Sequence, residues 1–170
     1  MHGRKKVSID EATKIKKQQK AKKIKLMVAE AMESRENPEK EKAFIETGTP
    51  ILDLLDDFAT VWNMRKEYVL KNKTKEVIDN ELKIAGRVLL SNPKSYWGWH
   101  HRRWCIDLLD DYDCHSELEL SSQFILSDCR NFHAWRHRRW AAHKCGNVDN
   151  EELQNMSKLI EANFSNFSAW

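Results

Sequence analysis

The amino-acid sequence predicts an all-helical fold, a superhelix of stacked helical hairpins. The 170 residues include only 5 glycines and 3 prolines, so the tight turns that strands need are poorly supported. Tryptophan recurs at intervals of 35 to 37 residues, which is the size of a repeat made of two helices. Between these tryptophans, apolar residues recur at helical spacing. Together these three observations favour a tandem array of hairpins.

Four tryptophans in one phase define the repeat. They are separated by 37, 36 and 35 residues, and six of the seven tryptophans in the chain belong to the pattern. An arginine lies three residues after each of the first three, and a second basic residue follows it. The motif positions are Trp62, Arg65, Lys66, Trp99, Arg102, Arg103, Trp104, Trp135, Arg138, Arg139, Trp140 and Trp170. Chance does not produce this alignment.

Each unit is predicted to start with an amphipathic helix, to turn, and to place the tryptophan motif on a second helix. Apolar residues at helical spacing mark two of the first helices: Leu82, Ala85, Val88 and Leu89, then Leu153, Met156, Leu159 and Ile160. Pro93 cannot continue the helix before it. Ser95, Asn131 and Asn166 share one repeat phase, and we expect them to cap the second helices.

The chain divides into a basic N-terminal arm or helix, residues 1–33, and a repeat region, residues 44–170. The repeats are expected at about 45–75, 77–112, 114–146 and 150–170. Residues 1–25 hold ten lysines or arginines and two acids, and Ser8 with Glu11 has capping-box spacing that predicts a helix start near Ser8. The arm is either a solvated helix or a surface for an acidic partner, a membrane or nucleic acid. Because the fourth motif stops at its tryptophan, we expect the chain to be a fragment.

The recurring tryptophans and arginines are interpreted as structural. A tryptophan present once in each unit is expected to fill the space between hairpins. The arginines either bridge neighbouring units through carboxylates such as Glu81, Glu117 or Glu119, or project as a basic ridge. The constant phase favours bridging. Function is therefore expected where the repeats differ.

Cysteine and histidine spacing predicts neither a disulfide framework nor a metal site on this chain. Cys105, Cys114, Cys129 and Cys145 include no C-x-x-C pair, so we expect free thiols in a reducing, cytoplasmic compartment. The histidines have no zinc-cage spacing. Glycine-rich nucleotide motifs are absent, so no bound cofactor is predicted. No apolar run approaches the ~20 residues that span a bilayer, so stable membrane insertion is not expected.

The repeated segments resemble the protein prenyltransferase alpha-subunit repeat. The matching strings are "NPKSYWGWHHRRW", "DCRNFHAWRHRRW" and the shortened "NFSNFSAW", and with the weaker first copy "DDFATVWNMRKEYVL" they cover about residues 50–170. That first copy has Lys66 where the family has a second arginine. Within the family, "MHGRKK" and "NFSNFSAW" are more similar to the alpha subunit of Rab geranylgeranyltransferase than to that of farnesyltransferase.

The resemblance implies a right-handed, TPR-like alpha-alpha superhelix that wraps around a separate beta subunit. It implies one half of a heterodimeric enzyme, inactive without the beta subunit, that transfers geranylgeranyl from geranylgeranyl diphosphate to C-terminal cysteines of Rab GTPases. The zinc and the thiol-substrate site are expected on the beta subunit, and a Rab escort protein presents the substrate. No nucleic acid is implied.

Three site residues are implied by motif position: Lys94, Tyr96 and His133. In the family, residues at these positions face the diphosphate, where an ammonium, a phenol and an imidazole N–H stabilise the charge of the leaving group. All three are expected at the starts of second helices, whose dipoles favour anions. Without the resemblance they are an exposed lysine, a core aromatic residue and a surface imidazole. His2, on the basic arm, is a further candidate to approach the partner's zinc.

Two alternatives remain open from the sequence. The first is the alpha subunit of farnesyltransferase or of geranylgeranyltransferase type I. The second is a non-catalytic helical-repeat scaffold that binds peptide or RNA through its aromatic and basic residues. The net acidic character of residues 26–170 argues against RNA.

Overall fold

The fold is all-helical throughout the part of the chain that the computed structural model describes, residues 10–46, 50–146 and 149–170. Those residues form eight α-helices and one short 3-10 helix, without a strand. The chain separates into two compact units, Met1–Leu55 and Asp56–Trp170. The boundary falls inside the first expected repeat, 45–75.

The first unit contains α1 (Glu11–Glu36), α2 (Pro38–Glu46) and η1 (Pro50–Asp53). Asp10 caps α1 by accepting a hydrogen bond from the Thr13 amide at 2.7 Å. Ser8, the cap expected from the sequence, lies outside the described residues. Only Ala31 and Ser34 of α1 are buried, so its lysine-rich part is exposed on every side.

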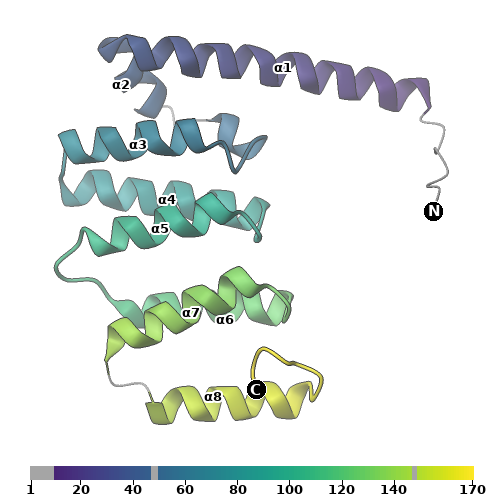
Figure 1. The fold of residues 1–170 in the computed structure, drawn as a ribbon, viewed down its shortest axis with the longest axis vertical. Coiled ribbons are helices and arrows are strands. Elements are labelled where there is room, and N and C mark those ends of the chain that lie inside the picture. The colour runs from purple at the N-terminus through teal and green to yellow at the C-terminus, as the bar shows by residue number, and fades with distance from the viewer. Residues whose placement is uncertain (1–9, 47–49, 147–148) are drawn as a thin grey trace, which may run out of the picture. The chain divides into compact units, whose positions relative to one another are not determined.

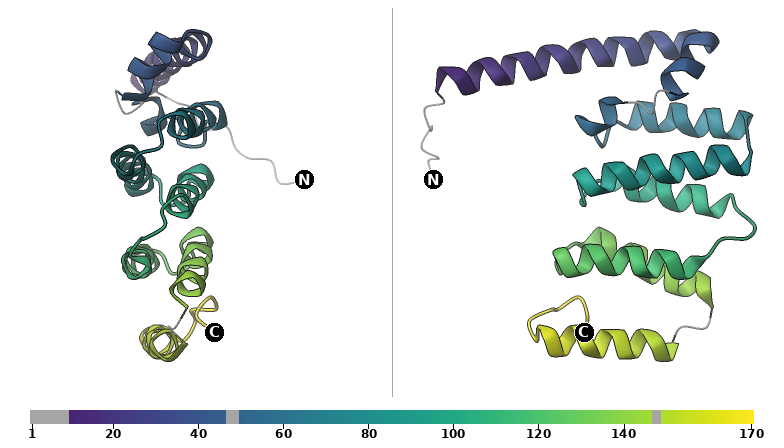
Figure 2. Two further views of the ribbon diagram at one scale, coloured as in Figure 1. Left: turned by 90° about the vertical axis from the view of Figure 1, so that its left-hand side faces the viewer. Right: turned by 180° about the vertical axis from the view of Figure 1, so that it is seen from behind.

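The second unit is a stack of helical hairpins. It contains α3 (Ala59–Lys71), α4 (Lys75–Ser91), α5 (Tyr96–Asp107), α6 (Cys114–Ser127), α7 (Phe132–Cys145) and α8 (Asp149–Ala162). Helices α4 and α5 form one hairpin, and α6 and α7 form the next (Figure 1). Seen along the helices, α3, α5 and α7 form one layer and α4, α6 and α8 form the other (Figure 2). This arrangement is the predicted alpha-alpha superhelix.

Two of the three predicted caps are present. The Ser95 hydroxyl accepts a hydrogen bond from the Gly98 amide at 3.0 Å, and the Asn131 side chain accepts from the His133 and Ala134 amides. Asn166 is buried, but the residues after it form a turn rather than a helix. The prediction that Asn166 caps a helix is therefore wrong for this chain, and its Oδ1 atom has no hydrogen-bond partner among the described residues.

Three of the repeated tryptophans are buried, and each forms a hydrogen bond across the turn before the helix that carries it. Trp62, Trp99 and Trp135 expose no more than 4% of their surface. Each indole N–H donates to the carbonyl six residues earlier, at 2.7, 2.9 and 2.8 Å respectively. Burial combined with this fixed hydrogen bond explains why tryptophan alone suits the position. Trp170 makes the same bond at 3.2 Å but is 70% exposed.

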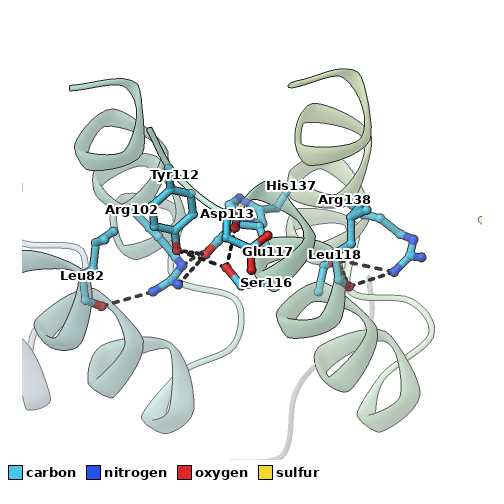
Figure 3. A network of polar contacts seen from close by, with 10 residues as sticks. Leu82, Arg102, Tyr112, Asp113, Ser116, Glu117, Leu118, His137 and Arg138 are labelled. Atoms are coloured by element: carbon cyan, nitrogen blue, oxygen red, sulfur yellow. Dashed lines mark hydrogen bonds and ion pairs between the residues drawn. The ribbon is translucent and has the colours of Figure 1, made fainter. Parts of the chain in front are cut away.

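A buried carboxylate joins each hairpin to the one before it. The Arg65 guanidinium donates two hydrogen bonds of 2.8 Å to Glu81, and Glu81 also contacts His101 Nε2 at 2.9 Å. Figure 3 shows the next such site, where Arg102 donates to Glu117 at 2.6 and 2.7 Å and His137 Nε2 lies 2.7 Å from it. We call this arrangement the Arg–Glu–His bridge.

The third bridge uses a carboxylate that the sequence analysis did not name. Arg138 donates to Glu152 of α8 at 2.7 and 2.9 Å. Glu119, one of the three predicted partners, is exposed instead, because it lies two residues from the buried Glu117 on the opposite side of α6. The bridging interpretation is thus confirmed for Glu81 and Glu117 and wrong for Glu119.

Charge on the bridge is set by competition between burial and hydrogen bonding. Burial opposes ionisation of Glu117, but hydrogen bonds from His137 and Arg102 outweigh it and hold its pKa at about 2. Burial lowers the pKa of His137 and of His101, although their glutamates act the other way. Both imidazoles are therefore neutral at pH 7, with Nε2–H donating to the carboxylate.

The cysteine pattern differs from the free thiols expected. Cys114, at the start of α6, and Cys145, at the end of α7, form a disulfide, and their Cα atoms are 5.6 Å apart. The antiparallel hairpin brings these helix ends together across 31 residues of sequence, a separation that no short motif reveals. Cys105 and Cys129 are free. Among the described helices, none is both long and apolar enough to cross a bilayer.

Replacing Arg102 with alanine is predicted to destabilise the second unit by about 3–5 kcal/mol, because it leaves the Glu117 carboxylate buried beside only His137 and Tyr112. Arg139→Ala is the matched control, since Arg139 is exposed on α7, and it should cost less than about 0.5 kcal/mol. Urea unfolding followed by circular dichroism measures both. Equal losses in the two variants would contradict the structural role of the bridge.

Stability is predicted to fall in two steps on acidification. The folded pKa of His101 and of His137 is depressed, so the unfolded chain takes up protons first, and stability declines once the pH drops below about 6.5. Glu117 stabilises fully above its ordinary pKa of 4.5, and that contribution is lost as the pH approaches about 2. Urea unfolding at a series of pH values tests this, and His137→Gln should weaken the first step. Constant stability between pH 7 and 5 would contradict it.

Candidate functional site

The turns that precede α5 and α7 are stacked at one side of the hairpin array. The Asn92 side-chain amide donates to Asp56 Oδ2 at 2.6 Å, and the Asn131 amide donates to the Pro93 carbonyl at 2.9 Å. The Ser95 hydroxyl also donates to Asp57 Oδ1 at 2.9 Å. These hydrogen bonds fix the starts of the second helices beside one another, where the three predicted site residues occur.

Lys94 lies in the turn before α5 with 63% of its side chain exposed. Its ammonium is 2.9 Å from Asp128 Oδ2 in the turn before α7, and the hydrogen bond from Lys94 lowers the Asp128 pKa. An exposed pair of this kind contributes little to stability, because water screens the charges. The ammonium can therefore exchange the carboxylate for an anionic ligand at little cost.

Tyr96 and His133 are brought together by the stacking of α5 on α7. Their rings are 6.4 Å apart between centroids and meet edge to face. Tyr96 is the first residue of α5 and is 46% exposed, so it is not a core aromatic residue. His133 follows the first residue of α7 and is half-buried, with its ring 3.9 Å from that of Phe132. The phenol and the imidazole belong to one surface.

Burial lowers the pKa of His133, and Arg136 and Arg103 add to this effect while Asp57 opposes it. The imidazole is therefore neutral at pH 7. A neutral ring has one N–H to donate, which suits an oxygen that gains negative charge during a reaction.

A set of basic residues that sequence reasoning did not assign to the site lies next to Tyr96 and His133. We call it the basic cluster, and it consists of Lys66 on α3, His100 and Arg103 on α5, and Arg136 on α7. Lys66 Nζ lies 3.1 Å from His100 Nε2 and within 5.6 Å of the ring centroids of Trp97 and Trp104. All four residues belong to the same helix layer (Figure 2).

The basic residues of the cluster disfavour one another's charged forms. Burial lowers the pKa of His100, and Lys66 and Arg103 lower it further. Burial and the neighbouring Arg136 likewise lower the pKa of Arg103, although Tyr96 and Asp107 act the other way. The buried Nε atom of Arg103 has no hydrogen-bond partner among the described residues. Mutual repulsion of this kind is relieved by an anion.

A sequence signal for the cluster existed. His100 and Arg103, like Arg136 and Arg139, follow their tryptophan by one and four residues, and this spacing puts each pair on one face of a helix.

Metal-ligand groups occur together at one place among the described residues, where Cys114, His115 and Cys145 have their ligand atoms within 4.8 Å of one another. Spacing rules missed this group because its members come from two helices. His2, the candidate to approach the zinc of a partner, lies outside the described residues.

The fold and site together define a helical-repeat protein in which three successive repeats each carry a buried tryptophan and an arginine that bonds to a glutamate of the next repeat. A family model described as the protein prenyltransferase alpha subunit repeat matches residues 78–109, 114–145 and 149–170. The chain therefore belongs to the protein prenyltransferase alpha-subunit repeat family.

The chain is also similar to curated alpha subunits of one enzyme type. The chain is 36% identical to the geranylgeranyl transferase type-2 subunit alpha of Mus musculus and 35% identical to that of Homo sapiens, in each case over 100% of this chain and 32% of the relative. It is 30% identical to the protein of that name from Candida albicans, over 62% of this chain. The chain spans about a third of the length of these curated relatives.

Proposed function

We propose that this chain acts as part of the alpha subunit of a Rab geranylgeranyltransferase. In this proposal a beta subunit binds beside the layer formed by α3, α5 and α7, and the pair transfers geranylgeranyl from its diphosphate to C-terminal cysteines of Rab GTPases. The observation that carries it is the meeting of Tyr96 and His133, with 6.4 Å between ring centroids, beside the basic cluster in which Arg103 and Arg136 repel each other. The relatives' name, type-2, favours this branch over farnesyltransferase and type I enzymes.

In the proposed mechanism this chain stabilises the leaving diphosphate. The substrate thiolate attacks C1 of the isoprenoid, a sulfur–carbon bond forms, and the carbon–oxygen bond breaks with its electron pair going to the diphosphate. The Lys94 ammonium, the Tyr96 hydroxyl and the His133 N–H donate hydrogen bonds to the diphosphate oxygens as their charge grows. Arg103 and Arg136 raise the local positive potential without direct contact.

The remaining requirements lie on the partner. Zinc on the beta subunit would lower the pKa of the substrate thiol, and this chain is inactive without that subunit. A Rab escort protein presents the substrate, and the complex works in the cytoplasm. His2 belongs to this proposal as a group that approaches the partner's zinc.

The test is co-expression of the full chain with the beta subunit of a type-2 enzyme, followed by single-turnover transfer from labelled geranylgeranyl diphosphate to a Rab bound to its escort protein. The double variant Lys94→Ala/Tyr96→Phe should transfer roughly 10²–10³ times more slowly, which is the loss seen when a donor to a developing oxyanion is removed. Co-purification of the two subunits should be unchanged.

Lys83→Ala is the control, because Lys83 is exposed on α4 in the other helix layer. Its transfer rate should equal that of the unaltered chain. Full transfer by the double variant would refute the roles given to Lys94 and Tyr96. Failure of the chain to bind the beta subunit, together with binding to RNA that weakens steeply with salt, would replace the proposal with the scaffold alternative.

A further inference from the structure

The ends of α6 and α7 gather three metal-ligating side chains at the side of the hairpin opposite to Tyr96 and His133. Cys114 and His115 are the first two residues of α6, and Cys145 is the last residue of α7. Figure 1 shows that α6 begins and α7 ends on the same side of the stack. The two sulfur atoms and one ring nitrogen of His115 all lie within 4.8 Å of one another.

The backbone around this group is well defined. Asp113 caps α6 by accepting a hydrogen bond from the His115 amide at 3.0 Å, which fixes the turn that carries two of the three side chains. The third side chain, Cys145, is the last residue of α7. The helix ends there because Gly146 adopts the left-handed conformation, with φ of 74°, that glycine favours after a helix. Both cysteines are half-buried and His115 is exposed, so a solute can reach the group.

The chemistry of the three ligands is specific. Two thiolates and one imidazole match Zn²⁺, which takes Cys and His ligands in tetrahedral sites and can hold water at a fourth position. Cys114 lies at a helix N-terminus, where the thiolate form is favoured. Paired cysteines in a reducing compartment are more often metal ligands than structural disulfides.

We propose that Cys114, His115 and Cys145 form a redox-gated zinc site that holds the α6–α7 hairpin closed. In the oxidised state the two sulfurs are joined, as the structure shows, and no metal binds. A small dithiol reductant supplies the two electrons and two protons, is itself oxidised to its disulfide, and leaves Cys114 and Cys145 as two thiols. Zn²⁺ then displaces the two thiol protons and bonds to both sulfurs and to a ring nitrogen of His115.

The geometry permits both states with one backbone. Two Zn–S bonds of ~2.3 Å at a tetrahedral angle place the sulfurs roughly 3.8 Å apart. The Cα separation of 5.6 Å accommodates this by rotation about the Cα–Cβ bonds. The other two thiols are separate from the group: Cys129 lies in the turn before α7, and Cys105 is buried on α5 with its thiol pKa raised by burial.

The experiment uses the full chain, reduced with a water-soluble phosphine, which takes the oxygen of a water molecule while the disulfide becomes two thiols. Alkylation and mass measurement should count two reactive thiols before reduction under denaturing conditions and four after it. Zn²⁺ is then titrated in competition with a chromophoric chelator, and Co²⁺ replaces it as a spectroscopic probe. One ion should bind per chain, with a sulfur-to-cobalt charge-transfer band, and the melting temperature should rise.

Three variants decide the assignment. Cys145→Ser should abolish the charge-transfer band, and His115→Ala should weaken zinc binding at least about tenfold while the band persists. Cys129→Ser, the matched control outside the group, should bind as the unaltered chain does. Helical circular dichroism confirms that each variant is folded.

The proposal is overturned if the reduced chain binds no stoichiometric zinc, or if Cys145→Ser binds it as tightly as the unaltered chain. Binding that needs no reduction would equally overturn the gating. None of these measurements involves prenyl transfer, so they stand apart from the test of the proposed function.

Discussion

The hairpin stack depends on a glutamate that is buried between neighbouring units and shared by an arginine and a histidine. A carboxylate with 1% or less of its side chain exposed is unfavourable unless it is fully hydrogen-bonded, and Glu81 and Glu117 are satisfied only when the adjacent hairpin is in register. The bridge therefore fixes the register of each hairpin against the next. The buried tryptophans supply apolar contact and fix the turns through their indole hydrogen bonds. A stack made by apolar contact alone would tolerate sliding between hairpins.

Register is also what builds the candidate site. Tyr96 and His133 come from different repeats, so only the stacking of these repeats brings the two rings together. The stacked turns align the starts of α5 and α7, and the same alignment brings Arg103 and Arg136 close enough for each to influence His133. Structural bridges on one face of the motif helices thus position chemically useful groups on another.

The periodic features of the molecule could be predicted from the sequence, and the pairwise ones could not. Tryptophan phase, the caps at Ser95 and Asn131, and the bridging of Glu81 and Glu117 follow from periodicity, because each feature recurs in at least two units. The prediction that Glu119 forms a bridge was wrong. Glu117 and Glu119 lie two residues apart, and only the rotation of α6 about its axis decides which of them is buried. The pairing of Cys114 with Cys145 depends on contact between two helices that share no motif. The basic cluster depends on contacts between side chains of different motif helices, which the motif alone does not reveal. Whether Lys94, Tyr96 and His133 touch a diphosphate stays a prediction.

The Arg–Glu–His bridge has a direction along the stack. In each of the three bridges an arginine of one unit donates to a glutamate of the unit that follows, so the two faces of a unit are complementary rather than alike. Such a module joins to a copy of itself head to tail and in no other orientation. Duplication or loss of one whole unit during evolution would leave every remaining arginine–glutamate pair intact. Duplication or loss of part of a unit would leave an arginine or a glutamate buried without its partner. Gene rearrangements in such an array are therefore expected to be tolerated in steps of about 35 residues.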